Sequence, residues 1–355
     1  MKVYVLPADP HGCGHYRLVW PANVLQQQGW NITIMPPSEE SGFLAKVEDK
    51  PDGQKVITSV RVPDDADVIV VQRPAHHLQP QMIELMRANR IAVVVDMDDD
   101  MSNIHPENIA FNTYRHRSNS VMSHKWVVES CKRATLVTTS TRKLQKVYAK
   151  HGRGVVIDNF VPEAYLDFPN VPSGFFGWAG TTRSHPTDLQ VTGISVRGLM
   201  AEGYRFKVVG GKSDVQRCLK LQESPDVTGS VPLQDWARTI GLTLDVGMAP
   251  LSVSEFNSAK SRLKPIEYMS VGVPWVGSPR EEYRRVQRES GCGFLADTPK
   301  EWYRLLKQLL DDEVLRKEQA EAGRSYMVSQ TYQANAWRWA EAWTKALEIE
   351  RGRAA

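Results

Sequence analysis

The stretch NSAKSRLKPIEYMSVGVPWVGS, residues 257–278, decides the fold prediction for this chain. In a helix, its residues Lys260, Lys264 and Glu267 would share one narrow face, because they are spaced i, i+4 and i+7. A face with two cations and one carboxylate is typical either of a solvated helix surface or of a site for a charged ligand. Both interpretations stay open from the spacing alone.

Turn-forming residues set the ends of this helix. Pro265 is tolerated only in the first turn, so we expect the helix to start near residues 258–261. Gly272 would end it, and the run VPWVG would begin a buried strand. Serines and lysines then gather at a helix N-terminus, where free N–H groups and the helix dipole favour a diphosphate. A carboxylate one turn further along can accept hydrogen bonds from a ribose diol.

Short runs rich in Val and Ile alternate with helical stretches along the rest of the chain. Strands are predicted over residues 2–6, 30–36, 67–73, 91–100, 135–140, 155–162, 174–180, 206–211 and 245–251. Continuous apolar runs are typical of parallel strands that helices cover on both faces. We therefore predict an α/β fold with two βα-repeating halves, which meet at the Pro-rich connector 163–173.

Three segments stand apart from this alternation. Residues 38–65 are polar and predict an excursion with a hairpin around residues 51–53. The sequence TPKE is a capping box that opens a helix over residues 299–311. A long C-terminal helix over about residues 331–350 carries three tryptophans, which suit either docking on the first half or any packed core.

The segment K-S-R-L-K-P-I-E-Y-M-S-V-G-V-P resembles the donor-nucleotide helix of GT-B glycosyltransferases close to retaining family 4, of the type common in bacteria and phages. The resemblance extends over the whole chain and is weakest in residues 38–65. It implies two Rossmann-like, doubly wound domains that face each other across a cleft. The expected boundaries are 1–165 for an acceptor domain, 174–330 for a nucleotide-sugar donor domain, and 331–355 for a C-terminal helix that packs back on the first domain.

The resemblance also implies which residues hold the donor. Arg183, Lys260 and Lys264 would stabilise the leaving diphosphate, and Glu267 would bind the ribose. The family pattern has two glutamates eight positions apart, but Ala259 stands eight before Glu267, so we expect Glu255 in the first role. The residues expected to contact the nucleotide-sugar are Gly12, Gly14, Gly180, Thr181, Arg183, Glu255, Asn257, Ser258, Lys260, Ser261, Lys264 and Glu267.

Several polar residues in the expected ligand loops have plainer interpretations. The G-x-G of the first loop, residues 12–14, is also typical of a tight turn that binds nothing. Arg17 would either reach into the cleft or lie on the surface. His185 and Asp188 are expected to cap the helix that follows them. Residues 225–236 resemble the segment that contacts the nucleobase through main-chain atoms.

An acidic block, Asp96, Asp98, Asp99 and Asp100, ends a predicted buried strand. Four carboxylates in five residues repel one another, so some must meet cations, a metal or substrate hydroxyls. We expect Asp98 and Asp99 to be catalytic on the acceptor side, where one of them orients the attacking hydroxyl. The block contains D-x-D twice, which is the metal-binding signature of the GT-A fold. A single GT-A domain would not explain residues 174–297.

Composition narrows the class of protein. A chain of 355 residues with 41% hydrophobic residues predicts two folded domains, and a net charge of +3 argues against a nucleic-acid partner. Four separate cysteines without a CxxC pair predict reduced thiols. MKVYVLPAD runs directly into a strand, and no apolar run reaches membrane-spanning length, so we expect a soluble, cytoplasmic protein without a transmembrane segment.

These observations predict a glycosyltransferase that moves a sugar from a UDP- or GDP-sugar to a hydroxyl of a glycan, small molecule or protein. The resemblance implies retention of configuration without an essential metal, and Mg²⁺ or Mn²⁺ is not expected. Two alternatives remain: a metal-dependent D-x-D glycosyltransferase, and a catalytically silent GT-B nucleotide-binding module. No oligomeric state follows from the sequence.

Overall fold

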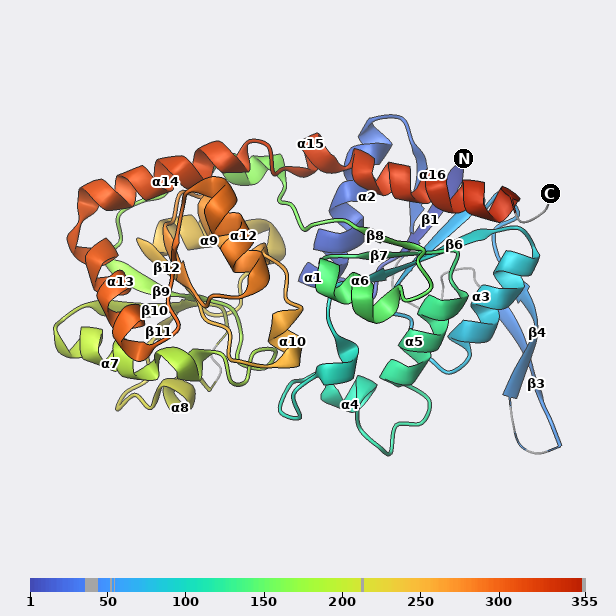
Figure 1. Cartoon of the computed structure of the whole chain (residues 1–355), viewed down its shortest axis with the longest axis horizontal. Coiled ribbons are helices and arrows are strands. Elements are labelled where there is room, and N and C mark those ends of the chain that lie inside the picture. The colour runs from blue at the N-terminus through green and yellow to red at the C-terminus, as the bar shows by residue number, and fades with distance from the viewer. Residues whose placement is uncertain (36–43, 52, 54, 212–213, 353–355) are drawn as a thin grey trace. The chain divides into compact units, whose positions relative to one another are not determined.

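The computed structural model describes residues 1–35, 44–51, 53, 55–211 and 214–352 of the chain. These residues form two compact units, both shown in Figure 1. The first unit comprises Met1–Ile104, Ala110–Asn159 and Tyr332–Ala355, and the second comprises His105–Ile109 and Phe160–Thr331. The division therefore falls at residue 159, before the predicted connector.

Within the described residues, the first unit holds a six-stranded parallel sheet in the order β2-β1-β5-β6-β7-β8. Its strands are β1 (Lys2–Leu6), β2 (Asn31–Ile34), β5 (Val68–Gln72), β6 (Ala92–Met97), β7 (Leu136–Thr139) and β8 (Gly154–Val156). Every residue of β6 is buried, as expected for a strand that helices cover on both faces. The predicted α/β fold is confirmed.

Helices cover both faces of this first sheet. Figure 1 shows α2 (Trp20–Gln27) and α16 (Trp337–Gly352) on one face, and α3 (Gln79–Ala88), α5 (His124–Arg133) and α6 (Arg142–Tyr148) on the other. This arrangement is expected from the strand order, which runs in opposite directions from β1, because crossovers between parallel strands are almost always right-handed. Short helical turns α1 (Gly12–Gly14), η1 (His15–Val19), η2 (Met101–Asn103), α4 (Phe111–Tyr114) and α15 (Tyr332–Asn335) complete the unit.

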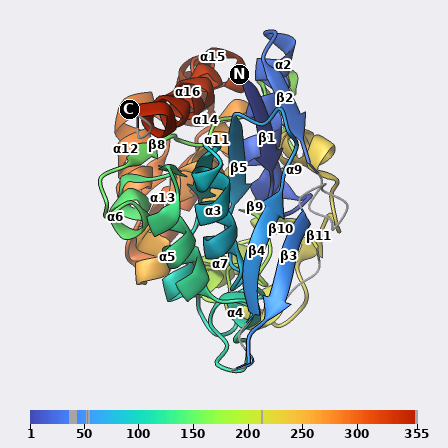
Figure 2. The same ribbon diagram turned by 90° about the vertical axis from the view of Figure 1, so that its right-hand side faces the viewer.

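The predicted hairpin is present. Strands β3 (Leu44–Asp49) and β4 (Lys55–Arg61) pair antiparallel, and Figure 2 shows them side by side. Gly53 has a φ of +78°, which suits a turn. Residues 36–43 and Asp52 lie outside the described residues.

The C-terminal segment packs on the first sheet. The Tyr332 hydroxyl donates to the Tyr16 carbonyl at 2.6 Å, and the Trp339 indole donates to the Arg17 carbonyl at 2.8 Å. Trp339 and Trp343 are fully buried, whereas Trp337 is 50% exposed. Only two of the three tryptophans therefore belong to the core of this unit.

Within the described residues, the second unit also holds a six-stranded parallel sheet, in the order β11-β10-β9-β12-β13-β14. The strands are β9 (Phe175–Ala179), β10 (Arg205–Val209), β11 (Asp226–Val227), β12 (Val246–Ala249), β13 (Trp275–Gly277) and β14 (Phe294–Leu295). The helices are α7 (Gly193–Ala201), α8 (Val215–Leu219), α9 (Trp236–Thr243), α10 (Glu255–Ser258), α11 (Leu263–Ser270), α12 (Glu281–Ser290), α13 (Pro299–Asp311) and α14 (Glu313–Met327). Shorter helical turns are η3 (Glu163–Asp167), η4 (Leu189–Thr192) and η5 (Leu233–Asp235). The capping box of α13 is confirmed, but α14 was not predicted.

The key helix of the sequence analysis is split, which corrects its predicted start. Ser254 accepts a hydrogen bond from the Asn257 N–H and caps α10 as a separate helical turn. The chain then turns, and α11 begins only at Leu263. Lys260 therefore lies in the turn and shares no helix face with Lys264. Gly272 ends α11 with a φ of +71°, as predicted.

Candidate functional site

The strand order of the second sheet reverses between β9 and β12. In open parallel sheets, ligands bind at such a switch point, outside the carboxyl ends of the strands. Two loops leave the sheet there: residues 180–188 follow β9, and residues 250–254 follow β12 and lead into α10. The candidate donor site of the sequence analysis is built on these two loops and on α11.

Tyr268 of α11 holds the two strands together at the switch point. Its hydroxyl accepts a hydrogen bond from the Ala179 N–H at 3.0 Å and donates to the Met248 carbonyl at 2.8 Å. The ring packs so closely that a Cβ on Gly247 would lie 2.8 Å from it, so this position requires glycine. Burial raises the pKa of Tyr268, so its hydroxyl keeps the proton that it donates.

Asp188 joins the two loops. Its Oδ1 accepts hydrogen bonds from the Ser252 N–H at 2.9 Å, the Ser252 hydroxyl at 3.0 Å and the Asn257 amide at 2.6 Å, while Oδ2 accepts from His185 Nδ1 at 2.8 Å. Burial raises the pKa of Asp188, but these hydrogen bonds outweigh it and the net shift is downward. Asp188 is thus a buried carboxylate that fixes both loops. The prediction that it caps a helix is wrong, because its oxygens serve the other loop.

The start of α11 carries a small polar cluster. Glu267 is 3% exposed, and its Oε1 accepts from the Trp236 indole at 3.0 Å. Lys264 Nζ lies 3.3 Å from Oε2 of the same carboxylate and 5.5 Å from the centre of the Trp236 ring. Lys264 and Glu267 therefore do meet, as neighbours one turn apart, and Trp236 completes the cluster.

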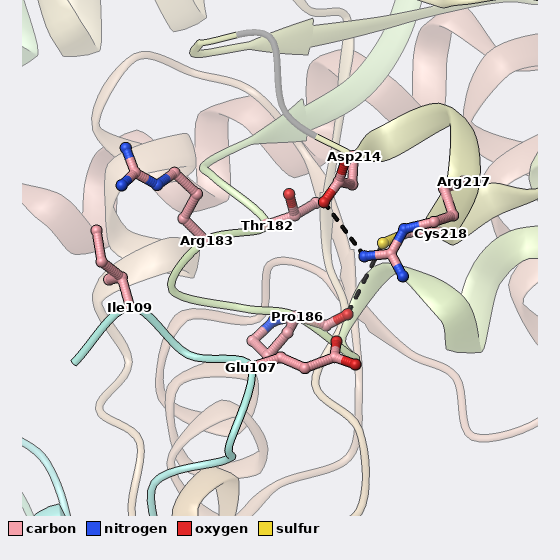
Figure 3. A pocket seen from close by; sticks show the side chains of 8 residues that line it. All are labelled: Glu107, Ile109, Thr182, Arg183, Pro186, Asp214, Arg217 and Cys218. Atoms are coloured by element: carbon pink, nitrogen blue, oxygen red, sulfur yellow. Dashed lines mark hydrogen bonds and ion pairs between the residues drawn. The ribbon is translucent and has the colours of Figure 1, made fainter. Parts of the chain in front are cut away.

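The structure places the other predicted donor residues around the same two loops. Arg183 is exposed and lines a cavity of about 370 Å³ with Thr182, Glu107 and Ile109. Figure 3 shows its guanidinium extending away from the Asp214–Arg217 ion pair on the other side of this cavity. The remaining positions, Gly180 and Thr181, follow β9 directly.

Residues around α10 divide into exposed and buried members. Glu255 is exposed, and Lys260 lies with its ammonium 4.4 Å from the centre of the Phe256 ring. Asn257 is 4% exposed, and its amide donates to Asp188 and Ser252, so the side chain supports the loops from inside. The Ser258 hydroxyl donates to the Glu255 carbonyl, and Ser261 is half-buried in the turn.

The first unit has a comparable switch point between β1 and β5. Arg73 directly follows β5 in a left-handed conformation with a φ of +48°, which is rare for a non-glycine residue. Its guanidinium binds Asp98 with two hydrogen bonds and lies 3.9 Å from both Asp9 and Asp99. One arginine therefore gathers carboxylates from the loops after β1 and β6. The predicted repulsion within the acidic block is therefore relieved by arginines of the protein itself: Arg73 at Asp98 and Asp99, and Arg17 at Asp96.

A second buried arginine corrects the prediction for Arg17. This residue is fully buried, with Nε and Nη2 donating to the Asp96 carboxylate at 3.0 and 2.9 Å. Nη1 donates to the Ile157 carbonyl and to Asn159. Arg17 thus ties β6 to the segment after β8. It neither lies on the surface nor reaches out to a ligand, because all three of its nitrogens bond within the unit.

The loop after β1 turns its N–H groups toward its own carboxylate. Asp9 Oδ1 accepts from the N–H groups of His11 at 2.9 Å and Gly14 at 3.3 Å. A Cβ on Gly14 would lie 2.0 Å from the Asp9 carbonyl, so close packing explains this glycine. Phosphate binding by Gly12 and Gly14 stays a prediction, and the neighbouring Asp9 charge works against it. Desolvation raises the pKa of the Cys13 thiol to about 12, which removes it as a nucleophile.

The sequence analysis missed Arg73, Trp236 and Tyr268, and misassigned the roles of His185 and Asp188. The spacing H-x-x-D in a loop after a buried strand was a usable signal, because an acid three residues on can hold an imidazole nitrogen. Arg73 directly follows a Val-rich strand, and a charged residue there indicates the carboxyl edge of the sheet.

Comparison with known proteins agrees with this geometry. Residues 187–312, within the second unit, match the family model described as glycosyl transferases group 1. No curated protein matches the chain. Among solved structures, sucrose-phosphate synthase from Thermosynechococcus elongatus is similar over 100% of both chains, with a TM-score of 0.62 at 13% identity. The fold is GT-B.

Two further structures extend the comparison. A glycosyltransferase from Rickettsia africae has a TM-score of 0.62 at 11% identity and covers 98% of this chain and 99% of its own. An α-glucosyltransferase in complex with UDP-glucose and DNA containing an abasic site has a TM-score of 0.60 at 13% identity and covers 97% and 98%. The family match and these GT-B neighbours support a glycosyltransferase enzyme.

Two features of the described residues bear on a membrane and on metal ions as partners. No helix among them is long and apolar enough to cross a membrane. No group of three or more His, Cys, Asp or Glu side chains in the described part of the chain is arranged to hold a metal ion. The expectation that nucleic acid is not a partner stays a prediction, since the α-glucosyltransferase is bound to DNA.

Proposed function

We propose that this protein transfers a sugar from a nucleotide-sugar to an acceptor hydroxyl, and that the second unit holds the donor at its β9/β12 switch point. The observation that carries the proposal is the Asp188 network, which fixes the two loops that emerge at this point. The Lys264–Glu267 pair on α11 adds a cation and a carboxylate for the nucleotide. The cation suits the anionic diphosphate, and the carboxylate suits the hydroxyl groups of the ribose.

The Lys264–Glu267 pair suggests how the nucleotide is accommodated. The side chain of Lys264 is 19% exposed and the side chain of Glu267 is 4% exposed, so the lysine is the outer partner of the pair. We propose that Lys264 leaves the carboxylate for the diphosphate, which carries more negative charge. Glu267 Oε2 then accepts hydrogen bonds from the ribose diol, while the Trp236 indole keeps Oε1 in place. The exposed Arg183 supplies a second cation to the diphosphate.

UDP is our first choice of nucleotide. Two of the similar α-glucosyltransferase structures contain UDP or UDP-glucose, and a TarM structure contains UDP. GDP-sugars are the second choice. Residues 225–236, which include Trp236, would contact the base through main-chain atoms, as the resemblance to GT-B glycosyltransferases implies.

The acceptor is assigned to the first unit. Asp9, Asp98 and Asp99 all lie within 4 Å of the Arg73 guanidinium, so three carboxylates gather around this arginine at the switch point. Such a site favours a neutral or cationic polyol over a polyanion such as DNA. A carbohydrate, small molecule or protein hydroxyl fits, and Asp99, whose side chain is 19% exposed, is more accessible to it than Asp98, whose side chain is 9% exposed. We propose retention of configuration and no essential metal.

Nucleotide binding and turnover test the proposal together. A thermal-shift panel of UDP-, GDP-, ADP- and dTDP-sugars identifies the donor, because a bound ligand raises the apparent stability. Glu267→Ala should then weaken donor binding by about 1–3 kcal/mol, the scale of a lost hydrogen bond to a charged group. Lys264→Ala and Arg183→Ala should lower kcat more than they raise KM, because charge develops on the diphosphate in the transition state.

Each result has an opposite that counts against the proposal. Binding of a nucleotide-sugar without hydrolysis or transfer to any acceptor would favour the silent binding module. Unchanged nucleotide affinity in a folded Glu267→Ala protein would remove the ribose assignment. If Lys260→Ala is crippled while Lys264→Ala is nearly normal, the turn before α11 holds the diphosphate instead.

A further inference from the structure

His185 is held in one orientation beside the proposed donor loops. Its Nδ1 lies 2.8 Å from Asp188 Oδ2, and its ring packs edge-on to Trp178 with the ring centres 6.4 Å apart. The side chain is 25% exposed, whereas Asp188 is 3% exposed. The described residues offer no hydrogen-bond partner to its second ring nitrogen, Nε2. The imidazole is therefore anchored at its inner edge, with Nε2 at the opposite edge.

The Asp188 network fixes which nitrogen carries the hydrogen. Three donors, two from Ser252 and one from Asn257, already bind Oδ1, so Asp188 is set up as an acceptor. The hydrogen bonds that keep the pKa of Asp188 low, against the effect of burial, keep it ionised. An ionised carboxylate can only accept, so His185 Nδ1 must donate to it. In the neutral imidazole, Nε2 then presents a lone pair and acts as a hydrogen-bond acceptor.

We infer that His185 binds a hydroxyl of the donor's sugar through Nε2 and so helps to select that sugar. The inference rests on the proposed function. A diphosphate carries only acceptor oxygens, which a lone pair would repel, and the ribose diol is already assigned to Glu267. The transferred sugar is the remaining part of the donor that offers hydroxyl groups to an acceptor. His185 follows Gly180–Arg183, the loop proposed to hold the diphosphate to which that sugar is attached.

The two loops do not require His185 for their structure. Asp188 would still receive three hydrogen bonds from Ser252 and Asn257 without it, so the loops do not depend on the imidazole. A phenyl ring at position 185 would keep the packing against Trp178 and lose only the nitrogens. The variant His185→Phe therefore separates ligand binding from loop structure.

Calorimetric titration with UDP and with UDP-glucose tests the inference. If the wild type prefers a guanine nucleotide, GDP and the GDP-hexose take their place. His185→Phe should bind the nucleotide-sugar about tenfold more weakly than the wild type, the factor that corresponds to one hydrogen bond. Affinity for the free nucleoside diphosphate should stay within about twofold. Gln190→Ala, in the neighbouring exposed position, is the control and should change neither affinity.

Deoxy-sugar donors identify the hydroxyl. When the donor lacks the hydroxyl that His185 binds, the wild type and His185→Phe should bind that donor with equal affinity. When the donor lacks any other hydroxyl, the wild type should still bind it about tenfold more tightly than His185→Phe does. Should the phenyl variant misfold, His185→Ala is measured in the same way.

Equal weakening of diphosphate and nucleotide-sugar by either variant would overturn the inference, as would no change in either affinity. A wild type that binds no nucleotide-sugar in the panel would instead refute the proposed function itself.

Discussion

Tyr268→Phe tests how the switch point of the second sheet is held. The change removes one oxygen atom and keeps the ring that packs on Gly247. In the wild type, β9 and β12 pair as far as Trp178 and Met248, and the Tyr268 hydroxyl then bridges the Ala179 N–H to the Met248 carbonyl. The hydroxyl thus links the two strands at the point where their pairing ends and the loops 180–188 and 250–254 begin.

The expected magnitude follows from two buried groups that lose their partner. An unsatisfied buried donor or acceptor costs about 1–3 kcal/mol, and the carbonyl has a second lone pair, so we expect a loss of about 2–4 kcal/mol in the free energy of unfolding. With a urea m-value of about 2–3 kcal/mol/M, the unfolding midpoint should fall by about 1 M.

Tyr303→Phe is the matched control for this measurement. Its hydroxyl donates to Glu202 at the surface, so the same chemical change should leave the unfolding midpoint close to that of the wild type. Urea unfolding followed by tryptophan fluorescence compares the two variants with the wild type. Equal midpoints for Tyr268→Phe and Tyr303→Phe would refute the reasoning, because the bridge would then contribute nothing to the sheet.

Three further predictions concern the two sites. Arg17→Met leaves the fully buried Asp96 carboxylate without its ion-pair partner, so thermal or urea unfolding should show a loss of about 3–5 kcal/mol; a loss below 1 kcal/mol would contradict the burial of the pair. Asp98→Asn should impair transfer to acceptor while nucleotide binding and slow donor hydrolysis survive, and EDTA should have little effect; loss of donor affinity with rescue by Mn²⁺ would make the acids metal ligands. Asp188 has a lowered pKa in the folded state, so its stabilising contribution is present above its unfolded pKa of about 3.9 and is lost as the pH falls further. The difference in Tm between the wild type and Asp188→Asn should therefore shrink below about pH 4, and a constant difference across pH would contradict the shift.

Elements with local signals were predictable from the sequence. The Val- and Ile-rich runs of β5 and β6 can be recognised from the sequence, because strands that are buried on both faces are mostly apolar along their length. The capping box of α13 is recognisable because its two residues, Thr298 and Glu301, are only three positions apart. The end of α11 is recognisable because Gly272 readily adopts the positive φ that a helix end requires. In each case the physical cause lies within one turn of chain.

Elements fixed by distant partners were not predictable in the same way. Helix α11 starts late because Arg262, just before it, is buried and donates to Tyr326 and Gln330, which are 64 and 68 residues further along the chain. No pattern within the sequence KSRLKP indicates these two contacts of Arg262. The periodicity therefore placed Lys260 on a helix to which it does not belong.

The site residues follow the same division. The contact between Glu267 and Lys264 was predictable because their spacing on one helix is a local property, and their role toward a nucleotide stays a prediction. The partners of Arg17 and Asp188 were not, because Asp96 is 79 residues from Arg17 and Asn257 is 69 residues from Asp188. Single charged residues in a sequence cannot show whether they face solvent, a ligand or each other, since that depends on which strand ends the sheet brings together.

Hydrogen–deuterium exchange with and without UDP-glucose tests the central claim most directly, which is that the second unit holds the nucleotide-sugar at the β9/β12 switch point. Saturating ligand should slow exchange in peptides that cover residues 180–188 and 252–270, because both loops and the start of α11 would contact the donor. The GDP-hexose replaces UDP-glucose if the wild type prefers it. Protection confined to the loops of the first unit, or bound nucleotide-sugar without protection at residues 180–188 and 252–270, would contradict the account.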